Sequence, residues 1–184
     1  MTISRICLAP VFYIVFSIPE WTGRSAELSA IIMIILFAVM ELSDLLDGII
    51  ARKYNMVTDL GKIMDPFADV MSRMTYFICF VSYGIMPIWI LLFLFYRELG
   101  ITFLRMYMIK KGSVMAASIW GKAKAVSYSV SGILGLFIII TRRLGLLLDY
   151  YAAFNNILFI SLLISLFAAL LSFFIYLLFA IKQK

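Results

Sequence analysis

The chain is a succession of apolar segments separated by short polar connections. A helix needs about 20 mostly apolar residues to cross the hydrocarbon core of a bilayer. We expect such helices over residues 6–18, 28–51, 61–83, 87–109, 124–140 and 152–181. The first is short and would have to extend into its flanks or tilt. The pattern therefore predicts an all-α polytopic membrane protein, a six-transmembrane-helix bundle in which residues 1–184 form a single domain.

The composition supports this interpretation and excludes several kinds of chemistry. Apolar residues make up 65% of the 184 residues and charged residues 14%, with a mean hydropathy of +1.07. A soluble domain is nearer half apolar and a quarter charged. The chain has no histidine, which excludes Ser-His-Asp triads and His-ligated zinc. Its two cysteines, Cys7 and Cys79, lie in apolar runs and form no CxxC pair, so a disulfide framework or thiol metal site is not expected.

The positive charges predict the orientation, because cytoplasmic loops of membrane proteins are enriched in lysine and arginine. Six spans place both termini on one side. Ten positive residues fall on that side: Arg5, Arg52, Lys53, Lys62, Lys110, Lys111, Lys122, Lys124, Lys182 and Lys184. Only Arg24, Arg142 and Arg143 fall on the other. We expect an integral protein of the inner, cytoplasmic membrane with cytoplasmic termini. Its net charge of +6 suits anionic lipid headgroups better than nucleic acid.

One short stretch concentrates acidic residues where they are costly. It contains six of the ten acids of the chain: Glu41, Asp44, Asp47, Asp59, Asp65 and Asp69. A charge inside a bilayer costs roughly 2.5–3.5 kcal/mol on insertion scales. Asp44 and Asp47 are spaced i,i+3, and Asp65 and Asp69 i,i+4, so each pair shares one helix face. Two helices joined by a tight turn would aim four carboxylates at one volume.

Four converging carboxylates require cations. Oxygen ligands without thiols or imidazoles select Mg²⁺, Mn²⁺ or Ca²⁺, so we expect a site with one or two divalent ions. The alternative is ion pairing of the acids with Arg52, Arg73, Arg97 or Arg105. Gly48 and Gly61 flank the acids and would let a ligand approach bare backbone, or would serve helix packing and the turn. Arg52 would bridge phosphate oxygens or anchor the helix at the interface.

Taken together, the segment reads Asp44-x-x-Asp47-Gly48-x-x-Ala51-Arg52, eight residues, then Gly61-x-x-x-Asp65-x-x-x-Asp69. It resembles the signature of the CDP-alcohol phosphotransferase family at every fixed position. The resemblance implies six transmembrane helices, a homodimer and a cytoplasm-facing polar cavity that holds divalent metal, here Mg²⁺ or Mn²⁺ and two ions. It also implies the exchange of CMP on a CDP-linked substrate for an alcohol.

The resemblance also assigns roles to residues of this chain. Asp44, Asp47 and Asp65 would be metal ligands, and Asp69 the general base with a metal contact of its own. The residues implied to bind the CDP-lipid are Gly48, Ala51, Arg52, Thr58, Gly61 and Thr2. Thr2 belongs to the start Thr2-x-x-Arg5, which resembles the Leu-Thr-x-x-Arg of many members. Arg73 would orient Asp69 or form a simple i,i+4 ion pair with it.

Further along, Arg97-Glu98, Arg105 and Gly121-Lys122-x-Lys124 resemble the phosphatidylglycerophosphate synthase branch, which has threonine where this chain has Ala125. That branch implies CDP-diacylglycerol as donor, sn-glycerol 3-phosphate as acceptor, and phosphatidylglycerol phosphate and CMP as products. The candidates for the acceptor phosphate are Arg97, Arg105, Lys122 and Lys124. The lysines would alternatively attract lipid headgroups, and Arg97 would alternatively pair with Glu98.

Other functions remain open from the sequence. Within the family the acceptor would be serine, inositol phosphate or a second lipid. Outside the enzyme class, intramembrane carboxylates also mark ion pathways, so a divalent-cation transporter is an alternative. That alternative leaves the fixed spacing of Gly48, Arg52 and Gly61 unexplained.

Overall fold

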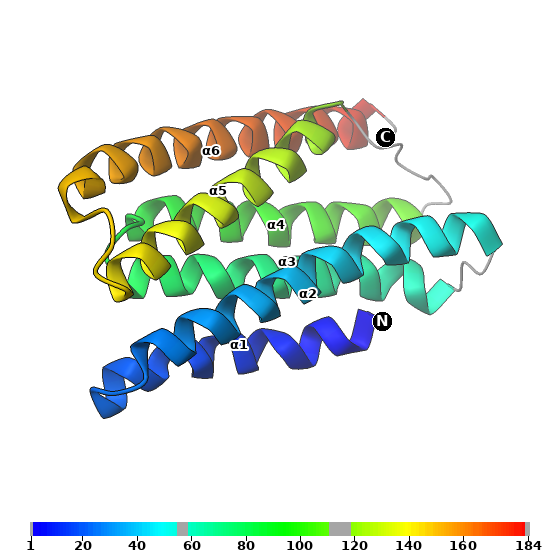
Figure 1. Cartoon of the computed structure of the whole chain (residues 1–184). Helices are drawn as coiled ribbons and strands as arrows, with labels where there is room; N and C mark the ends of the chain where they lie inside the picture. Colours follow the sequence, from blue (N-terminus) through cyan, green and yellow to red (C-terminus); the bar gives the residue numbers. More distant parts are fainter. Residues whose placement is uncertain (1, 55–58, 111–118, 183–184) are drawn as a thin grey trace.

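The protein was analysed as a computed structural model that describes residues 2–54, 59–110 and 119–182. The side chains of residues 2, 3, 44–54, 59–63, 65, 109, 110 and 182 lie outside the description. The described chain is a bundle of six α-helices with one 3₁₀ turn (Figure 1). The elements are α1 (Thr2–Thr22), α2 (Ala26–Tyr54), α3 (Asp59–Ser82), α4 (Ile88–Lys110), α5 (Ile119–Arg143), η1 (Leu148–Tyr150) and α6 (Tyr151–Lys182).

The expectation of an all-helical chain with six helices is confirmed. Three helices extend clearly beyond their expected bounds: α1 beyond residues 6–18 and α2 beyond residues 28–51, each at both ends, and α5 begins at Ile119 rather than at Lys124. Hydropathy marks where the apolar segment ends, whereas a helix continues into polar residues as long as its backbone hydrogen bonds are made. Lys122 and Lys124 therefore lie inside α5 and not in a loop before it.

Three segments of the described chain are both long and apolar enough to cross a membrane. They are Ala26–Ser43, Ile119–Arg143 and Leu148–Ile181. The helices α1, α3 and α4 contain 21, 24 and 23 residues. At 1.5 Å per residue they are also long enough to span a hydrocarbon core of about 30 Å. Arg97, Glu98 and Arg105 interrupt the apolar character of α4, so that spanning by all six helices stays a prediction.

Glycines follow three of the helices at the same side of the bundle, and the first of them is Gly23 after α1, with φ of 65°. Gly84 follows α3 and Gly145 follows α5, with φ of 78° and 66°. After α3, the Ile85 amide donates to the Phe80 carbonyl (3.0 Å) and the Gly84 amide to the Val81 carbonyl (3.0 Å). This pair of bonds defines the Schellman motif, in which a left-handed residue closes the helix and which favours glycine. Both turns therefore reverse the chain tightly enough to keep consecutive helices antiparallel.

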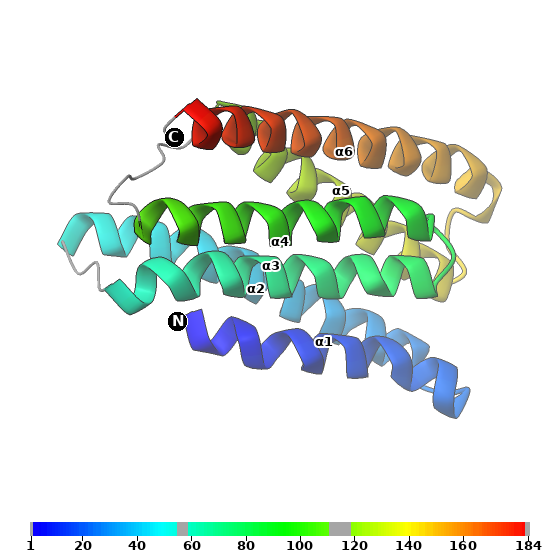
Figure 2. The ribbon, with the colours of Figure 1, turned by 180° about the vertical axis from the view of Figure 1, so that it is seen from behind.

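The core is aromatic and is built around α3 and α5. Tyr76, Phe77 and Phe80 of α3 pack edge-on or tilted against one another, and Phe77 meets the ring of Tyr128 on α5 at 5.6 Å between centroids. Around them α5 packs along α6, α1 packs on α2 and α3, and α4 packs on α3 and α6 (Figure 2). Phe80 fits against Gly135, where a Cβ atom would collide with the ring. The glycine thus permits the close approach of α3 and α5.

Both termini lie at one end of the bundle, together with the end of α2 and the start of α3 (Figure 1). The turns after α1, α3 and α5 lie at the opposite end. The end with the termini carries most of the acidic motif, so the fold brings the two halves of that motif to the same level.

Candidate active site

A cavity of about 330 Å³ opens among α3, α4, α5 and α6. The described residues that line it are Pro66, Asp69, Val70, Arg73, Arg97, Glu98, Ile101, Thr102, Arg105, Gly121, Lys124, Ala125 and Tyr176. Four of these side chains are cationic and two are carboxylates. The described wall therefore has an excess of two positive charges, which suits an anionic ligand.

Asp69 reaches the cavity from α3. Its Oδ1 atom forms an ion pair with Nε of Arg73, one turn later, at 2.7 Å. The side chain of Asp69 is 28% exposed, whereas that of Arg73 is 8% exposed. The i,i+4 pair expected from the sequence thus exists, and it holds the carboxylate at the cavity wall. This position suits a general base, which must come within hydrogen-bond reach of the proton that it accepts.

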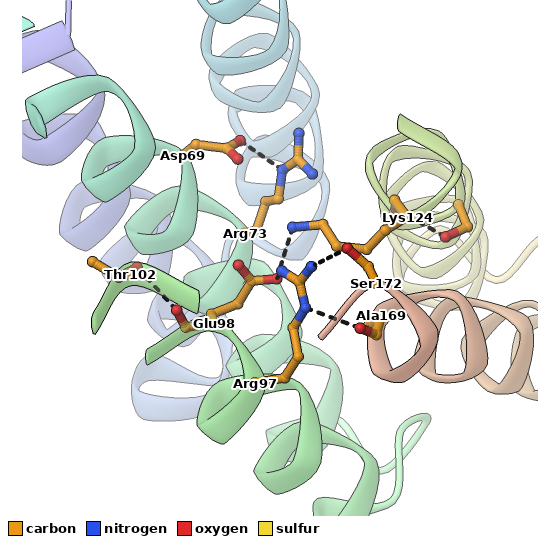
Figure 3. A network of polar contacts seen from close by, with 9 residues as sticks. Asp69, Arg73, Arg97, Glu98, Thr102, Lys124, Ala169 and Ser172 are labelled. Carbon is orange, nitrogen blue, oxygen red and sulfur yellow. Dashed lines mark hydrogen bonds and ion pairs between the residues drawn. The ribbon is translucent and has the colours of Figure 1, made fainter. Parts of the chain in front are cut away.

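Two adjacent residues of α4 are both buried and both charged. Arg97 is 5% exposed and Glu98 4% exposed. Nη1 of Arg97 donates to Oε1 of Glu98 at 2.9 Å. The same guanidinium donates from Nη2 to Oγ of Ser172 (2.9 Å) and from Nε to the carbonyl of Ala169 (3.1 Å), both on α6 (Figure 3). The Arg97–Glu98 pair considered as an alternative is therefore present, and Arg97 also ties α4 to α6.

Lys124 enters the cavity from the second turn of α5. Its Nζ atom donates to Oε1 of Glu98 at 2.7 Å and lies 4.6 Å from the centroid of the Tyr128 ring. The guanidinium carbon of Arg73 lies 5.8 Å from the same ring. The Tyr128 ring therefore lies between the core and two cations of the cavity, Arg73 and Lys124. Cations are attracted to the face of such a ring.

Arg105 lies two turns after Arg97 on α4 and lines the same cavity. Its guanidinium carbon is 5.8 Å from the centroid of the Tyr176 ring on α6. In the described part of the chain, Arg105 has no carboxylate partner. Lys122 is exposed and is not among the described residues that line the cavity. Of the four candidates for the acceptor phosphate, the structure thus brings three together.

Most of the predicted metal and CDP-lipid residues lie outside the described side chains. Asp44, Asp47, Gly48, Ala51 and Arg52 are positions of α2, Gly61 and Asp65 of α3, and Thr2 of α1. Thr58 lies outside the described residues altogether. Asp69 is the one predicted metal ligand whose side chain the structure describes.

A ring contact fixes the level of the two acidic segments. Phe37 of α2 and Tyr76 of α3 meet with centroids 5.5 Å apart. Position 44 follows Phe37 by seven residues, and Asp69 precedes Tyr76 by seven. Seven residues are close to two helical turns, so Asp69 lies on the face of α3 that makes the contact, and position 44 of α2 lies at the same level. Both positions lie two turns along, toward the end that carries the termini.

The donor set fits a hard divalent cation. Asp69 presents carboxylate oxygens to the cavity, and the other predicted ligands are also aspartates. Mg²⁺ and Mn²⁺ prefer such oxygen ligands. Among the side chains that the structure describes, no three acids, cysteines or histidines gather. The side chains of three of the four predicted ligands, Asp44, Asp47 and Asp65, are not among those described.

Reasoning from the sequence missed the contribution of α6 and the role of Glu98. Ser172 and Tyr176 support Arg97 and Arg105, although each is an ordinary residue in an apolar helix. The stripe of small residues that includes Ala169 and Ser172 is a signal in hindsight, since small residues mark close helix contacts in membranes. Glu98 had a clearer signal, because a carboxylate within an apolar span requires a partner.

The sequence pattern of the CDP-alcohol phosphatidyltransferases matches residues 1–180, which include every residue of the candidate site. The chain belongs to this family. CDP-alcohol phosphatidyltransferases are membrane-bound and use divalent metal ions, in agreement with the apolar helices and the acidic motif.

Several proteins of this family resemble the chain over much of its length. The CDP-diacylglycerol–glycerol-3-phosphate 3-phosphatidyltransferase of Treponema pallidum is 34% identical over 133 residues, 69% of this chain and 62% of that protein. The protein of that name from Bacillus subtilis is 35% identical over 130 residues, 67% of each chain. The Haemophilus influenzae protein of that name is 31% identical over 164 residues, 85% of each chain. The matched part thus spans less than two thirds of the Treponema relative.

Proposed function

We propose that the protein transfers a phosphatidyl group from CDP-diacylglycerol to sn-glycerol 3-phosphate, giving phosphatidylglycerol phosphate and CMP. The observation that carries the proposal is the meeting of Asp69 with Arg97, Arg105 and Lys124 around one cavity. A base and an anion-binding wall in the same hollow suit an acceptor that has a hydroxyl at one end and a phosphate at the other. The names of the relatives point to the same acceptor.

The charge of the cavity favours a phosphorylated acceptor over a neutral or zwitterionic one. A phosphate monoester is close to dianionic at neutral pH. The described wall carries an excess of two positive charges, which such a group would balance. Serine offers no phosphate to these cations. Inositol phosphate does, and the acceptor screen described below separates it from glycerol 3-phosphate.

The residues support a direct transfer. The acceptor hydroxyl gives its proton to the Asp69 carboxylate, and its oxygen attacks the phosphorus that bears diacylglycerol. The bond from that phosphorus to the bridging oxygen breaks, and the electron pair leaves with CMP. Arg73 keeps the Asp69 carboxylate in place at 2.7 Å. Holding the acceptor by its phosphate supplies the orientation that such an in-line displacement needs.

Asp44, Asp47, Asp65 and Asp69 would hold Mg²⁺ or Mn²⁺, two ions in our proposal. When bound, the metal supplies charge neutralisation at the pyrophosphate of the donor. Thr2, Gly48, Ala51, Arg52, Thr58 and Gly61 would contact the CDP-lipid.

The proposed setting is the cytoplasmic membrane, with all six helices spanning it and the cavity facing the cytoplasm. The excess of positive residues at the end with the termini supports this orientation. A homodimer belongs to the same proposal. Nucleic acid has no part in it.

An acceptor screen tests the proposed function. Purified protein would receive CDP-diacylglycerol, Mg²⁺ or Mn²⁺, and one alcohol at a time, with CMP release as the measurement. We expect glycerol 3-phosphate to give the fastest release, with serine and a second lipid near background. Faster release with serine or inositol phosphate would overturn the choice of acceptor. Mn²⁺ flux into liposomes that contain the protein, without CMP release, would favour the alternative function of a divalent-cation transporter.

A further inference from the structure

Glu98 brings two cations of the cavity to a single oxygen atom. Its Oε1 atom accepts from Nζ of Lys124 at 2.7 Å and from Nη1 of Arg97 at 2.9 Å (Figure 3). The three side chains are at most 9% exposed. Two buried cations so close to one point would repel each other without a carboxylate between them. Glu98 is therefore the counter-charge that allows both to lie in the cavity wall.

The two cations differ in what else they bind. Arg97 also donates to the carbonyl of Ala169 and the hydroxyl of Ser172, so its guanidinium is held on three sides by the protein. It cannot turn toward a ligand without losing contacts with α6. With three of its five N–H donors bound to the protein, Arg97 is the more firmly held of the two cations, and it fixes Glu98 relative to α6.

Lys124 keeps capacity for a ligand. An ammonium group has three donors. The described contacts of Nζ are the Oε1 atom of Glu98 and the face of the Tyr128 ring. Further donors can therefore reach a phosphate oxygen while the bond to Glu98 persists, and the bond decides where in the cavity the ammonium lies.

We propose that Glu98 is a positioning residue for the acceptor: anchored to α6 through Arg97, it holds the Lys124 ammonium where Lys124 and Arg105 receive the acceptor phosphate. The proposal rests on the proposed function and deepens it. It divides the predicted acceptor residues into two that touch the phosphate and one, Arg97, that acts through Glu98.

The first test is Glu98→Gln, which keeps the shape of the side chain and removes its charge. A misplaced Lys124 should raise the KM for glycerol 3-phosphate by about tenfold or more, since hydrogen bonds between charged groups are the strong ones. The KM for CDP-diacylglycerol should change less than about twofold, because the donor does not depend on Lys124. A merely structural role would affect both substrates alike. An unchanged or lower acceptor KM would overturn the proposal, the lower value showing that Glu98 competes with the phosphate.

Glu98→Asp covers the case in which E98Q does not fold. It keeps the charge and withdraws it by one methylene, so a smaller rise in acceptor KM is expected, again without a change for the donor. Equal KM values for wild type and E98D, in folded protein, would contradict the positioning role.

A double-mutant cycle tests whether Glu98 acts through Lys124. Lys124→Gln alone should raise the acceptor KM, and adding E98Q to it should raise it no further, because the group being positioned is gone. Independent, multiplying effects of the two substitutions would overturn the proposal.

Two serines of α6 provide a matched comparison. Both are fully buried, but Ser172 holds Arg97 whereas Ser165 meets Ser131 of α5. Ser172→Ala should raise the acceptor KM by a few-fold, and Ser165→Ala should leave it unchanged. Equal effects of the two would contradict the anchoring of Glu98 through Arg97.

The two proposals fail in distinguishable ways. If wild-type protein released no CMP with any phosphorylated acceptor, the proposed function itself would fall. If the wild-type protein were active and both E98Q and E98D kept its acceptor KM, the positioning role of Glu98 would be wrong and the proposed function would stand.

Discussion

The two ends of the bundle use arginine beside aromatic rings in different ways. At the end away from the termini, Arg143 donates to the carbonyl of Phe16 (2.6 Å) and the hydroxyl of Ser29 (2.9 Å), and its guanidinium carbon lies 4.9 Å from the centroid of the Phe16 ring. It fastens α5 to α1 and α2 through these hydrogen bonds and through a longer ion pair with Glu20 of α1 (3.9 Å). At the cavity end, Arg105 lines a hollow and contacts the face of the Tyr176 ring.

The difference shows what separates a structural arginine from a binding one. The chain itself satisfies Arg143, through a backbone carbonyl, a hydroxyl and the carboxylate of Glu20. The cavity end instead holds four cations against two carboxylates in the described wall. Substitutions at the far end should therefore change stability, whereas those around the cavity should change catalysis or acceptor binding.

Asp69→Asn should have the largest effect. Removing a general base typically costs about 10²- to 10⁴-fold in rate. We expect CMP release at saturating substrates to fall by that range, while the protein remains folded in detergent, as judged by its elution and thermal unfolding. Activity near that of wild type would show that another group takes the proton.

Lys124→Gln should come next, with a rise in the KM for glycerol 3-phosphate of about ten- to a hundredfold from the loss of a charged hydrogen bond. Lys122 stands two positions earlier on the same helix and is exposed. Lys122→Gln should therefore raise the KM by less than Lys124→Gln does. Steady-state kinetics on the two variants checks this, and the reverse order would contradict the placement of the phosphate in the cavity.

Arg143→Met should act on stability and not on acceptor binding. It removes two short hydrogen bonds and two ring contacts, so the free energy of unfolding should fall by about 2–4 kcal/mol. Unfolding in detergent, followed by circular dichroism, measures the loss. A raised acceptor KM in folded R143M protein would contradict the claim that Arg143 contributes to stability and not to acceptor binding.

Gly135→Ala should show the smallest effect of the series. The new methyl group would meet the ring of Phe80, and overpacking of this kind costs about 1–3 kcal/mol. The same assay should show lower stability with unchanged KM values. Stability equal to that of wild type would mean that the Phe80 ring moves aside at little cost.

The comparison also indicates how far the sequence could be interpreted. The six helices follow from hydropathy because each is built around an apolar segment, and the Asp69–Arg73 pair follows from local i,i+4 spacing. Arg97, Arg105 and Lys124 stand out as charges in or beside spans, so their meeting could be expected.

Contacts between helices that are distant in sequence could not be predicted in this way. The stripe of small residues on α6 marks a close helix contact, but it does not indicate that Ser172 and the carbonyl of Ala169 would receive Arg97, 72 to 75 residues earlier. Nor does the sequence distinguish Lys122 from Lys124, because that distinction requires the rotation of α5 against α4. Both depend on tertiary packing, which local patterns do not contain.

The most direct test of the central claim is the preference for glycerol 3-phosphate over glycerol, measured as the ratio of the two kcat/KM values in wild type and in Arg105→Gln. Glycerol offers the hydroxyl without the phosphate. We predict a strong preference in the wild-type enzyme and a loss of at least about tenfold in that ratio in the variant, with the rate on glycerol unchanged. An unchanged ratio in folded R105Q protein would contradict the claim that this cavity binds the acceptor by its phosphate.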